Sequence, residues 1–279
     1  MRLGRRVAVD ETLEVIVRRD RLVVVIALTA VIALAWVYLL AGAGMGMSAV
    51  EMTRQSQSGM VGGMATMTPT VWTPYYAGLM FFMWWIMMVA MMLPSAAPMI
   101  LLFSAVNRRQ RERGDPFVPT GIFAVGYLAA WAGFSVAASG VHWAFEQAGL
   151  LSALMTSTST RLSAAVLIVA GGWQLTPLKH ACLRHCRSPM HYLSHHWRRG
   201  RRGAFRMGVD HGAYCLGCCW FLMALLFYGG VMNLYWISGL ALYVLLEKTI
   251  PYGHWLGSIT GVALLFVGVA LLFGFIAPP

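Results

Sequence analysis

The run VDHGAYCLGCCWFLMALLFYG, residues 209–229, is an apolar stretch that holds one carboxylate, one histidine and three cysteines. As a helix it rises about 30 Å, the thickness of a bilayer's hydrocarbon core. Each helical residue turns the chain by about 100°, so His211, Cys215 and Cys218 share one face and Cys219 flanks it. Soft donors gathered on one face favour a metal or redox site. The alternative is that these cysteines pack as small hydrophobic side chains.

Composition places the whole chain in the membrane class. Hydrophobic residues make up 59% and charged residues 11%, against about 25% charge in soluble domains. Long apolar runs predict an all-α, polytopic transmembrane helical bundle of about seven spans. A basic amphipathic segment, residues 1–21, precedes this single domain, residues 22–279. The expected spans are 22–41, 77–102, 121–144, 162–179, 209–229, 234–250 and 255–276.

The distribution of basic residues predicts the orientation. Nineteen of the 21 lysines and arginines fall on one side of these spans, and only Arg54 and Arg161 fall on the other. The amino terminus is therefore expected in the cytoplasm, as a multi-pass protein of the bacterial inner membrane. The net charge of +11 is explained by this asymmetry and by contact with anionic headgroups of the lipid bilayer, so we expect no nucleic-acid partner.

A second group of soft donors lies in the span over 77–102. Met80, Met87 and Met91 share a face with Trp84, and Met88 and Met92 flank that face. Thioethers select Cu(I), although a methionine stripe also serves as ordinary packing. The span over 77–102 runs inward and 209–229 runs outward, so the methionines and the cysteines occupy overlapping depths. A mixed thiolate–thioether site between these two spans is therefore predicted.

Further candidate ligands lie toward the cytoplasm. Cys182 and Cys186 stand one helical turn apart in the basic loop over 179–207 and are suited to share one ion. Thiols stay reduced in the cytoplasm, which disfavours disulfides. Glu247, inside a span, is a metal ligand, a proton relay or the partner of a loop arginine. On the outer side, the methionine-rich and cysteine-free loop over 43–74 suits Cu(I) capture, or is merely low in complexity.

Several segments together resemble a known family. They are the Met-Met-Val-Ala-Met-Met-Leu-Pro run ending at Pro94, residues 174–189 with their two cysteines, the Cys-Leu-Gly-Cys-Cys-Trp run from Cys215, and residues 230–233 and 247–248. In combination they are similar to the bacterial, polytopic family described as predicted metal-binding integral membrane proteins, over about residues 77–250. The resemblance implies metal ligands among the five cysteines and the methionine run, and implies no reaction.

Three hypotheses follow. The first is a membrane protein that takes up, relays or inserts Cu(I) and meets a membrane or metallochaperone protein partner. The second is a membrane-embedded metalloenzyme, or a subunit of one, for which zinc is an alternative metal. The third is a structural subunit whose cysteines and methionines only pack. The sequence holds no phosphate-binding glycine loop and no hydrolase motif, which argues against ATP-driven pumping by this chain.

Overall fold

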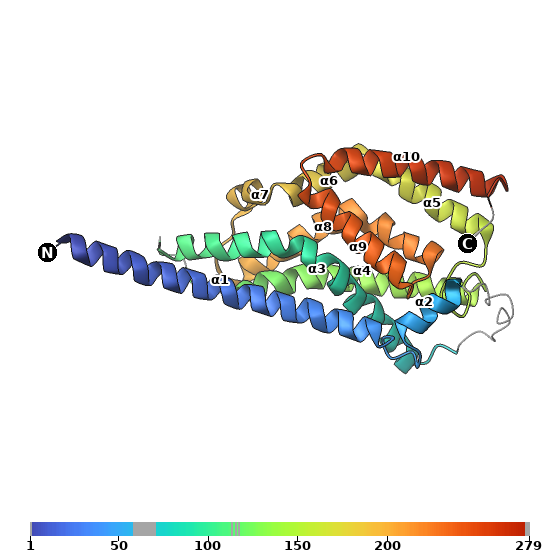
Figure 1. The fold of residues 1–279 in the computed structure, drawn as a ribbon, viewed down its shortest axis with the longest axis horizontal. Helices are drawn as coiled ribbons and strands as arrows, with labels where there is room; N and C mark the ends of the chain where they lie inside the picture. Colours follow the sequence, from blue (N-terminus) through green and yellow to red (C-terminus); the bar gives the residue numbers. More distant parts are fainter. Residues whose placement is uncertain (1, 58–70, 113, 115, 117, 277–279) are drawn as a thin grey trace.

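The computed structural model describes residues 2–276 apart from 58–70, 113, 115 and 117, with side chains described from residue 21 onward. These residues form ten α-helices and no β-strand, which confirms the all-α class (Figure 1). The helices are α1 (Arg2–Leu40), α2 (Ala49–Gln57), α3 (Pro74–Glu112), α4 (Thr120–Gln147), α5 (Thr160–Gln174), α6 (Pro177–Arg187), α7 (Pro189–His196), α8 (Gly200–Gly229), α9 (Leu234–Thr249) and α10 (Gly253–Leu272).

Five helices are long and apolar enough to cross a membrane, two fewer than the seven expected spans. They are Arg21–Leu40 of α1 together with α3, α4, α8 and α10. The other two expected spans form α5 and α9, which have 15 and 16 residues and rise only about 22 to 24 Å. A local signal ends α5 before residue 179, the expected end of its span, whereas α9 matches the expected 234–250 within one residue. Thr176 caps a new helix that starts at Pro177, and Pro251 follows the end of α9.

Glycines bring α4 and α8 into backbone contact along the bundle. A Cβ atom at Gly126 would stand 2.2 Å from the carbonyl oxygen of Phe205, and one at Gly208 would stand 2.1 Å from that of Phe123. Small residues allow such close approach between helices in a membrane. This contact sets Tyr127, next to Gly126, against α8. The pair α5 and α10 is joined in the same way through Gly171.

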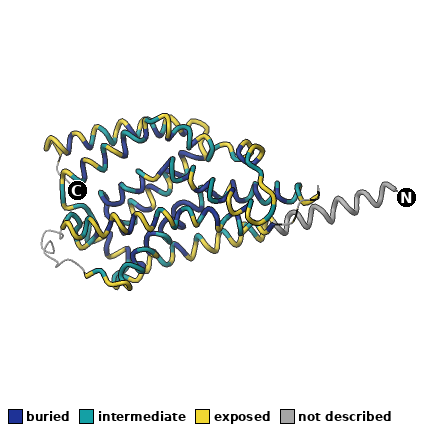
Figure 2. The backbone as a smooth tube through the Cα atoms, turned by 180° about the vertical axis from the view of Figure 1, so that it is seen from behind, coloured by how far each residue is buried: buried dark blue, intermediate teal, exposed yellow. Residues whose placement is uncertain are grey.

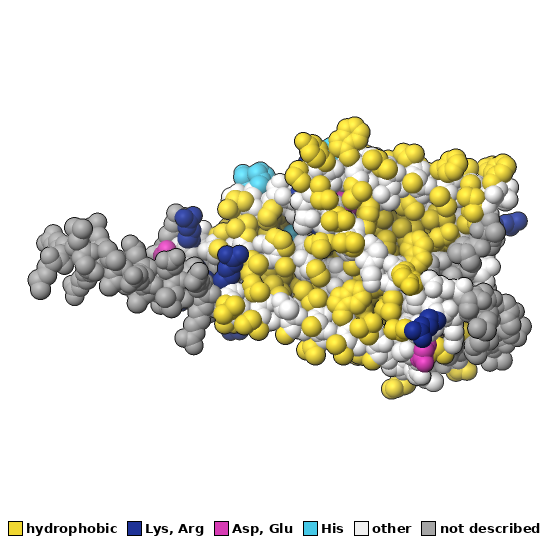
Figure 3. Space-filling view, in the orientation of Figure 1, with side chains coloured by type: hydrophobic (Ala, Val, Ile, Leu, Met, Phe, Trp, Pro, Cys, Tyr) yellow, Lys and Arg dark blue, Asp and Glu magenta, His cyan; other side chains and the backbone are white. Residues whose placement is uncertain are grey.

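The core lies where α3, α4, α8 and α9 meet. The helix α3 packs against α1, α4 and α9, while α8 packs against α4, α5 and α6. Buried residues line the inner faces of these helices, whereas α1 and α10 are largely exposed along their outer sides (Figure 2). Apolar side chains cover most of the face seen in Figure 3, and lysine and arginine side chains gather toward the ends of the bundle. This surface is the one expected of a membrane-embedded bundle.

Both segments expected as loops contain helices. Part of the segment over 43–74 forms α2, in which Met52 is buried, while Met60, Met64 and Met67 lie outside the described residues. The segment over 179–207 forms α6, α7 and the first turns of α8. The backbone of residues 2–40 is one helix, so the basic segment over 1–21 continues into the first span.

Candidate metal centre

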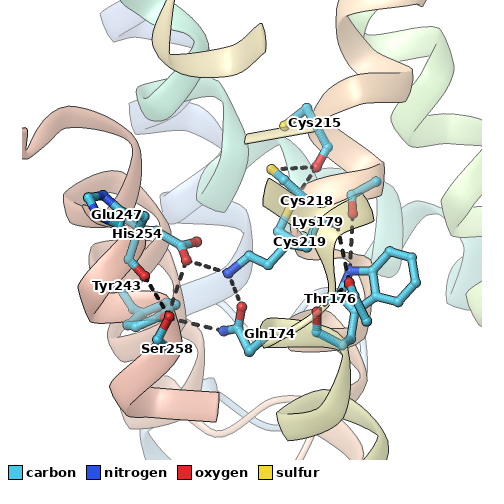
Figure 4. Close-up of polar contacts among 12 residues, drawn as sticks. Gln174, Thr176, Lys179, Cys215, Cys218, Cys219, Tyr243, Glu247, His254 and Ser258 are labelled. Atoms are coloured by element: carbon cyan, nitrogen blue, oxygen red, sulfur yellow. Dashed lines mark hydrogen bonds and ion pairs between the residues drawn. The ribbon is translucent and has the colours of Figure 1, made fainter. Parts of the chain in front are cut away.

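The three cysteines of α8 lie in the core of the bundle. Cys215, Cys218 and Cys219 have no exposed surface. The thiols of Cys218 and Cys219 donate to the carbonyl oxygen of Cys215, at 3.0 and 2.9 Å, so both are turned toward their own helix. Figure 4 shows these side chains on the inward side of α8. A rotation about the Cα–Cβ bond is enough to release either sulfur from this backbone contact.

A thiol and a thioether from the two predicted spans lie in contact. The Sγ atom of Cys219 is 3.8 Å from the Sδ atom of Met92 on α3. Met87, Met88 and Met91 are also fully buried on α3. Within the described residues, Met92 is the member of this run with a sulfur contact to a cysteine. The remaining three fill the core beside it.

Cys215 has two polar partners that the sequence did not single out. Its sulfur accepts a hydrogen bond from the Nζ atom of Lys248 at 2.9 Å, and the hydroxyl of Tyr127 lies 3.2 Å away. Lys248 also donates to the hydroxyl of Ser95 at 3.1 Å, and the Tyr127 hydroxyl donates to the carbonyl of Met92. A buried ammonium is stabilised by an anion in contact with it. The arrangement therefore favours the thiolate form of Cys215.

The helix α6 adds two more thiols to this cluster. Cys186 is half-buried, and the neighbouring thiols of Cys215 and Cys218, followed by burial, raise its pKa well above the ordinary value. Cys182 is half-buried, and burial followed by the proximity of Cys218 raises its pKa. Its sulfur lies against Gly217, where an added Cβ atom would stand 2.6 Å from it. The five cysteines thus form one cluster, from the core to the edge of the bundle.

Two anchors hold α6 against the bundle. The indole of Trp173 donates to the carbonyl of Gly217 at 3.1 Å, which fixes the end of α5 to α8 just before α6 begins. At the other end, the guanidinium of Arg187 donates to the carbonyl oxygens of Ile250 and Pro251 in the turn between α9 and α10. Both cysteines of α6 are therefore held in place on a fixed element.

His211 lies one helical turn from Cys215 and is 3% exposed. The rings of Tyr127 and Tyr192 flank its imidazole at 5.8 Å. Its Nδ1 atom has no hydrogen-bond partner within the described part of the chain. The imidazole is thus beside the thiol cluster without being bonded to it.

Glu247 does not join the sulfurs. Its carboxylate pairs with the ammonium of Lys179, which also donates to the side chain of Gln174, and the hydroxyl of Tyr243 lies 3.5 Å from the carboxylate (Figure 4). The neighbouring Lys248 points instead to Cys215. Successive residues of a helix point about 100° apart, so two adjacent charges in an apolar helix need two separate partners. The adjacent charges of Glu247 and Lys248 are therefore the signal in the sequence for the pairs Lys179–Glu247 and Lys248–Cys215.

Two lysines that contribute to the predicted orientation are buried. Lys179 has no exposed surface and Lys248 is 8% exposed, so neither lies among the lipid headgroups. Their charges are bound inside the bundle, by a carboxylate and by a thiol. The asymmetry of the remaining basic residues is unaffected.

As the side chains stand, no three His, Cys, Asp or Glu residues of the described chain are arranged to hold a metal ion. The thiols of Cys218 and Cys219 are hydrogen-bonded to a backbone carbonyl oxygen. Methionine thioethers are not among these four residue types. The donors nevertheless suit Cu(I), which soft thiolate and thioether ligands select. Among the described residues, the oxygen atoms in contact with these thiols are the carbonyl oxygen of Cys215 and the hydroxyl of Tyr127.

Comparison with known proteins identifies the family. The family model of the PpoB2 copper chaperones matches residues 81–271, a region that contains all five cysteines, the methionine run and Lys248. No curated protein and no solved structure is significantly similar to the chain. Because the match covers more than half of its length, the chain belongs to the PpoB2 copper chaperone family.

Proposed function

We propose that the chain is an integral membrane protein that handles Cu(I) and binds the ion between α3 and α8. The supporting observation is the buried contact of 3.8 Å between the sulfurs of Cys219 and Met92. Metal–thiolate bonds of about 2.3 Å put two sulfurs that share an ion at most about 4.6 Å apart. The two sulfurs already lie within that separation. Membership of a copper chaperone family supports copper as the ion.

The orientation predicted from the basic residues gives the transfer of copper through the protein a direction. It places the methionine-rich segment over 43–74 outside and α6 with its two cysteines inside the cell. Along the inward path the sulfur donors then change from the thioethers of this segment, through the pair Met92 and Cys219, to the thiolates of the cysteines on α6. Thiolates bind Cu(I) more strongly than thioethers because they carry a negative charge. An ion that enters from outside therefore meets progressively stronger ligands.

The contacts between thiols support transfer by ligand exchange. A new copper–sulfur bond forms before the old one breaks, the proton of the incoming thiol passes to the thiolate that leaves, and copper keeps its oxidation state. Lys248 holds Cys215 ready as a thiolate. Cys186 lies beside Cys215 and Cys218, so we assign it as the next acceptor. The half-buried Cys182 is the last, and is the thiol from which an acceptor protein takes the ion.

The test is an anaerobic Cu(I) titration of the purified protein against a colorimetric Cu(I) chelator. We expect stoichiometric binding that is lost when Cys215, Cys218 and Cys219 are changed together to serine. Met92→Leu should weaken binding at least tenfold, and Met99→Leu, at a buried methionine of α3 outside the methionine run, should leave it unchanged. Unaltered affinity in the triple variant, or retention of zinc in preference to copper, would show that the proposal is wrong.

A further inference from the structure

An apolar cleft of about 530 Å³ lies between α1, α3 and α4. Its walls include Val24 and Leu28 of α1, Leu93 and Ile100 of α3, and Leu128 of α4. The rim is apolar as well, since the exposed side chains of Val23, Val31 and Val125 border it. In a membrane-spanning bundle, such a cleft opens sideways to the acyl chains of the bilayer.

One end of this cleft is cationic. Asn107, Arg108 and Arg111 line it together with the first turn of α4. A second cavity, of about 730 Å³, shares Ser104 and Arg108 with the cleft and adds Arg21 and Arg109. Four arginines therefore converge where α3 ends, and within the described part of the chain Glu112 is the carboxylate that lines these cavities. Arginine binds phosphate in a bidentate manner and is favoured where phosphate is recognised.

The spacing of the two ends matches one leaflet of a bilayer. Leu93 and Arg108 are 15 residues apart on α3, which is about 22 Å along the helix axis. One leaflet contributes about 15 Å of hydrocarbon, and the headgroup region lies beyond it. An acyl chain in the apolar part of the cleft thus places its phosphate at the level of the arginines.

We propose that the cleft between α1, α3 and α4 binds one anionic phospholipid, with an acyl chain against Leu93 and Leu128 and the phosphate against Arg108 and Arg111. The charge of the cationic end selects an anionic over a zwitterionic headgroup. This inference requires that the chain span a membrane and is independent of copper binding.

The bound lipid lies directly behind the thiol cluster. Leu93 follows Met92, which contacts Cys219, and Leu128 follows Tyr127, which contacts Cys215. The indole of Trp85 on α3 also donates to the carbonyl of Leu128 on α4 at 3.0 Å. An acyl chain that fills the cleft therefore supports α3 and α4 from the side opposite the cysteines. Lipid binding is expected to hold Met92 and Tyr127 in position.

The test is native mass spectrometry of the detergent-purified protein titrated with phosphatidylglycerol, phosphatidylcholine or inorganic phosphate. We expect phosphatidylglycerol to bind at least tenfold more tightly than phosphatidylcholine. The double variant Arg108→Gln/Arg111→Gln should lose that preference, and the matched variant Arg201→Gln/Arg202→Gln, whose arginines are exposed at the start of α8, should keep it.

A second variant fills the cleft without removing charge. Ala27 of α1 is exposed and lines the apolar part of the cleft. Ala27→Trp therefore places an indole in this part of the cleft. It should reduce phosphatidylglycerol binding at least fivefold with an unchanged thermal midpoint of the lipid-free protein. Equal binding of the two lipids, equal binding by both arginine variants, or competition by inorganic phosphate at the concentration of the lipid would each overturn the proposal.

Discussion

Gly217→Ala is expected to displace one thiol of the cluster without unfolding the bundle. The added Cβ atom would stand 2.6 Å from the sulfur of Cys182 and 3.4 Å from the Cβ atom of Cys182. The latter is an ordinary contact, so the sulfur alone is in the way. Because Cys182 is half-buried, its side chain has room to rotate toward the surface.

The energies follow from two opposing effects. Overpacking costs about 1 kcal/mol where the displaced group is able to move, the lower end of the usual range. Replacing glycine by alanine inside a helix gains about 1 kcal/mol. The free energy of unfolding of Gly217→Ala should therefore stay close to that of the parent. In the background of Cys182→Ala the clash disappears, and the same substitution should gain about 1 kcal/mol.

A double-mutant cycle measures this difference. Unfolding of the four proteins in mixed micelles, followed by tryptophan fluorescence, should give a coupling energy of about 1 kcal/mol between the two sites. Gly133→Ala is the matched control, because a Cβ atom there meets nothing within 4 Å, and its effect should not depend on Cys182. Additivity of Gly217→Ala and Cys182→Ala within about 0.3 kcal/mol would refute the contact.

Four other outcomes are expected. Lys248→Met removes the ammonium beside Cys215 and should weaken Cu(I) binding at least tenfold in the chelator titration, so unchanged affinity would contradict the role of this pair. Glu247→Gln leaves a buried lysine without its carboxylate and should lower the free energy of unfolding by about 3 kcal/mol, with the copper stoichiometry retained. Gly208→Val forces α4 and α8 apart and should abolish the folded peak in size-exclusion chromatography, where a normal yield would contradict their backbone contact. The raised pKa of Cys182 means less thiolate at a given pH, so its alkylation by iodoacetamide should have a midpoint at higher pH than that of free cysteine.

The sequence predicts the class of the fold and most of its long helices, because hydrophobic length is a strong signal in membrane proteins. It does not predict that residues 162–179 are divided between α5 and α6. Pro177 and its capping residue Thr176 lie within that apolar run, whose hydropathy predicts one continuous span. A proline preceded by a threonine is a helix start even where the chain stays apolar.

The sequence places donors on a helix, and it does not say which donors from different helices meet. Periodicity puts Met87, Met91 and Met92 at the depth of the cysteines, yet Met92 is the one in contact with Cys219, since the outcome depends on how α3 is rotated in the bundle. Tyr127 meets Cys215 because Gly126 lets α4 approach α8. That relation joins positions 88 residues apart and has no local signature.

The two lysines and one carboxylate buried beside the thiols leave a surplus of one positive charge, because Glu247 neutralises Lys179 and Lys248 faces Cys215. A membrane interior penalises such a surplus, so the resting protein is expected to hold one thiolate. A Cu(I) ion that binds to this thiolate and to a second thiol then releases a single proton, and the total charge of the site stays constant. In the copper transfer proposed above, copper and proton would exchange one for one, and the membrane potential, which acts on net charge, would neither drive nor oppose that step.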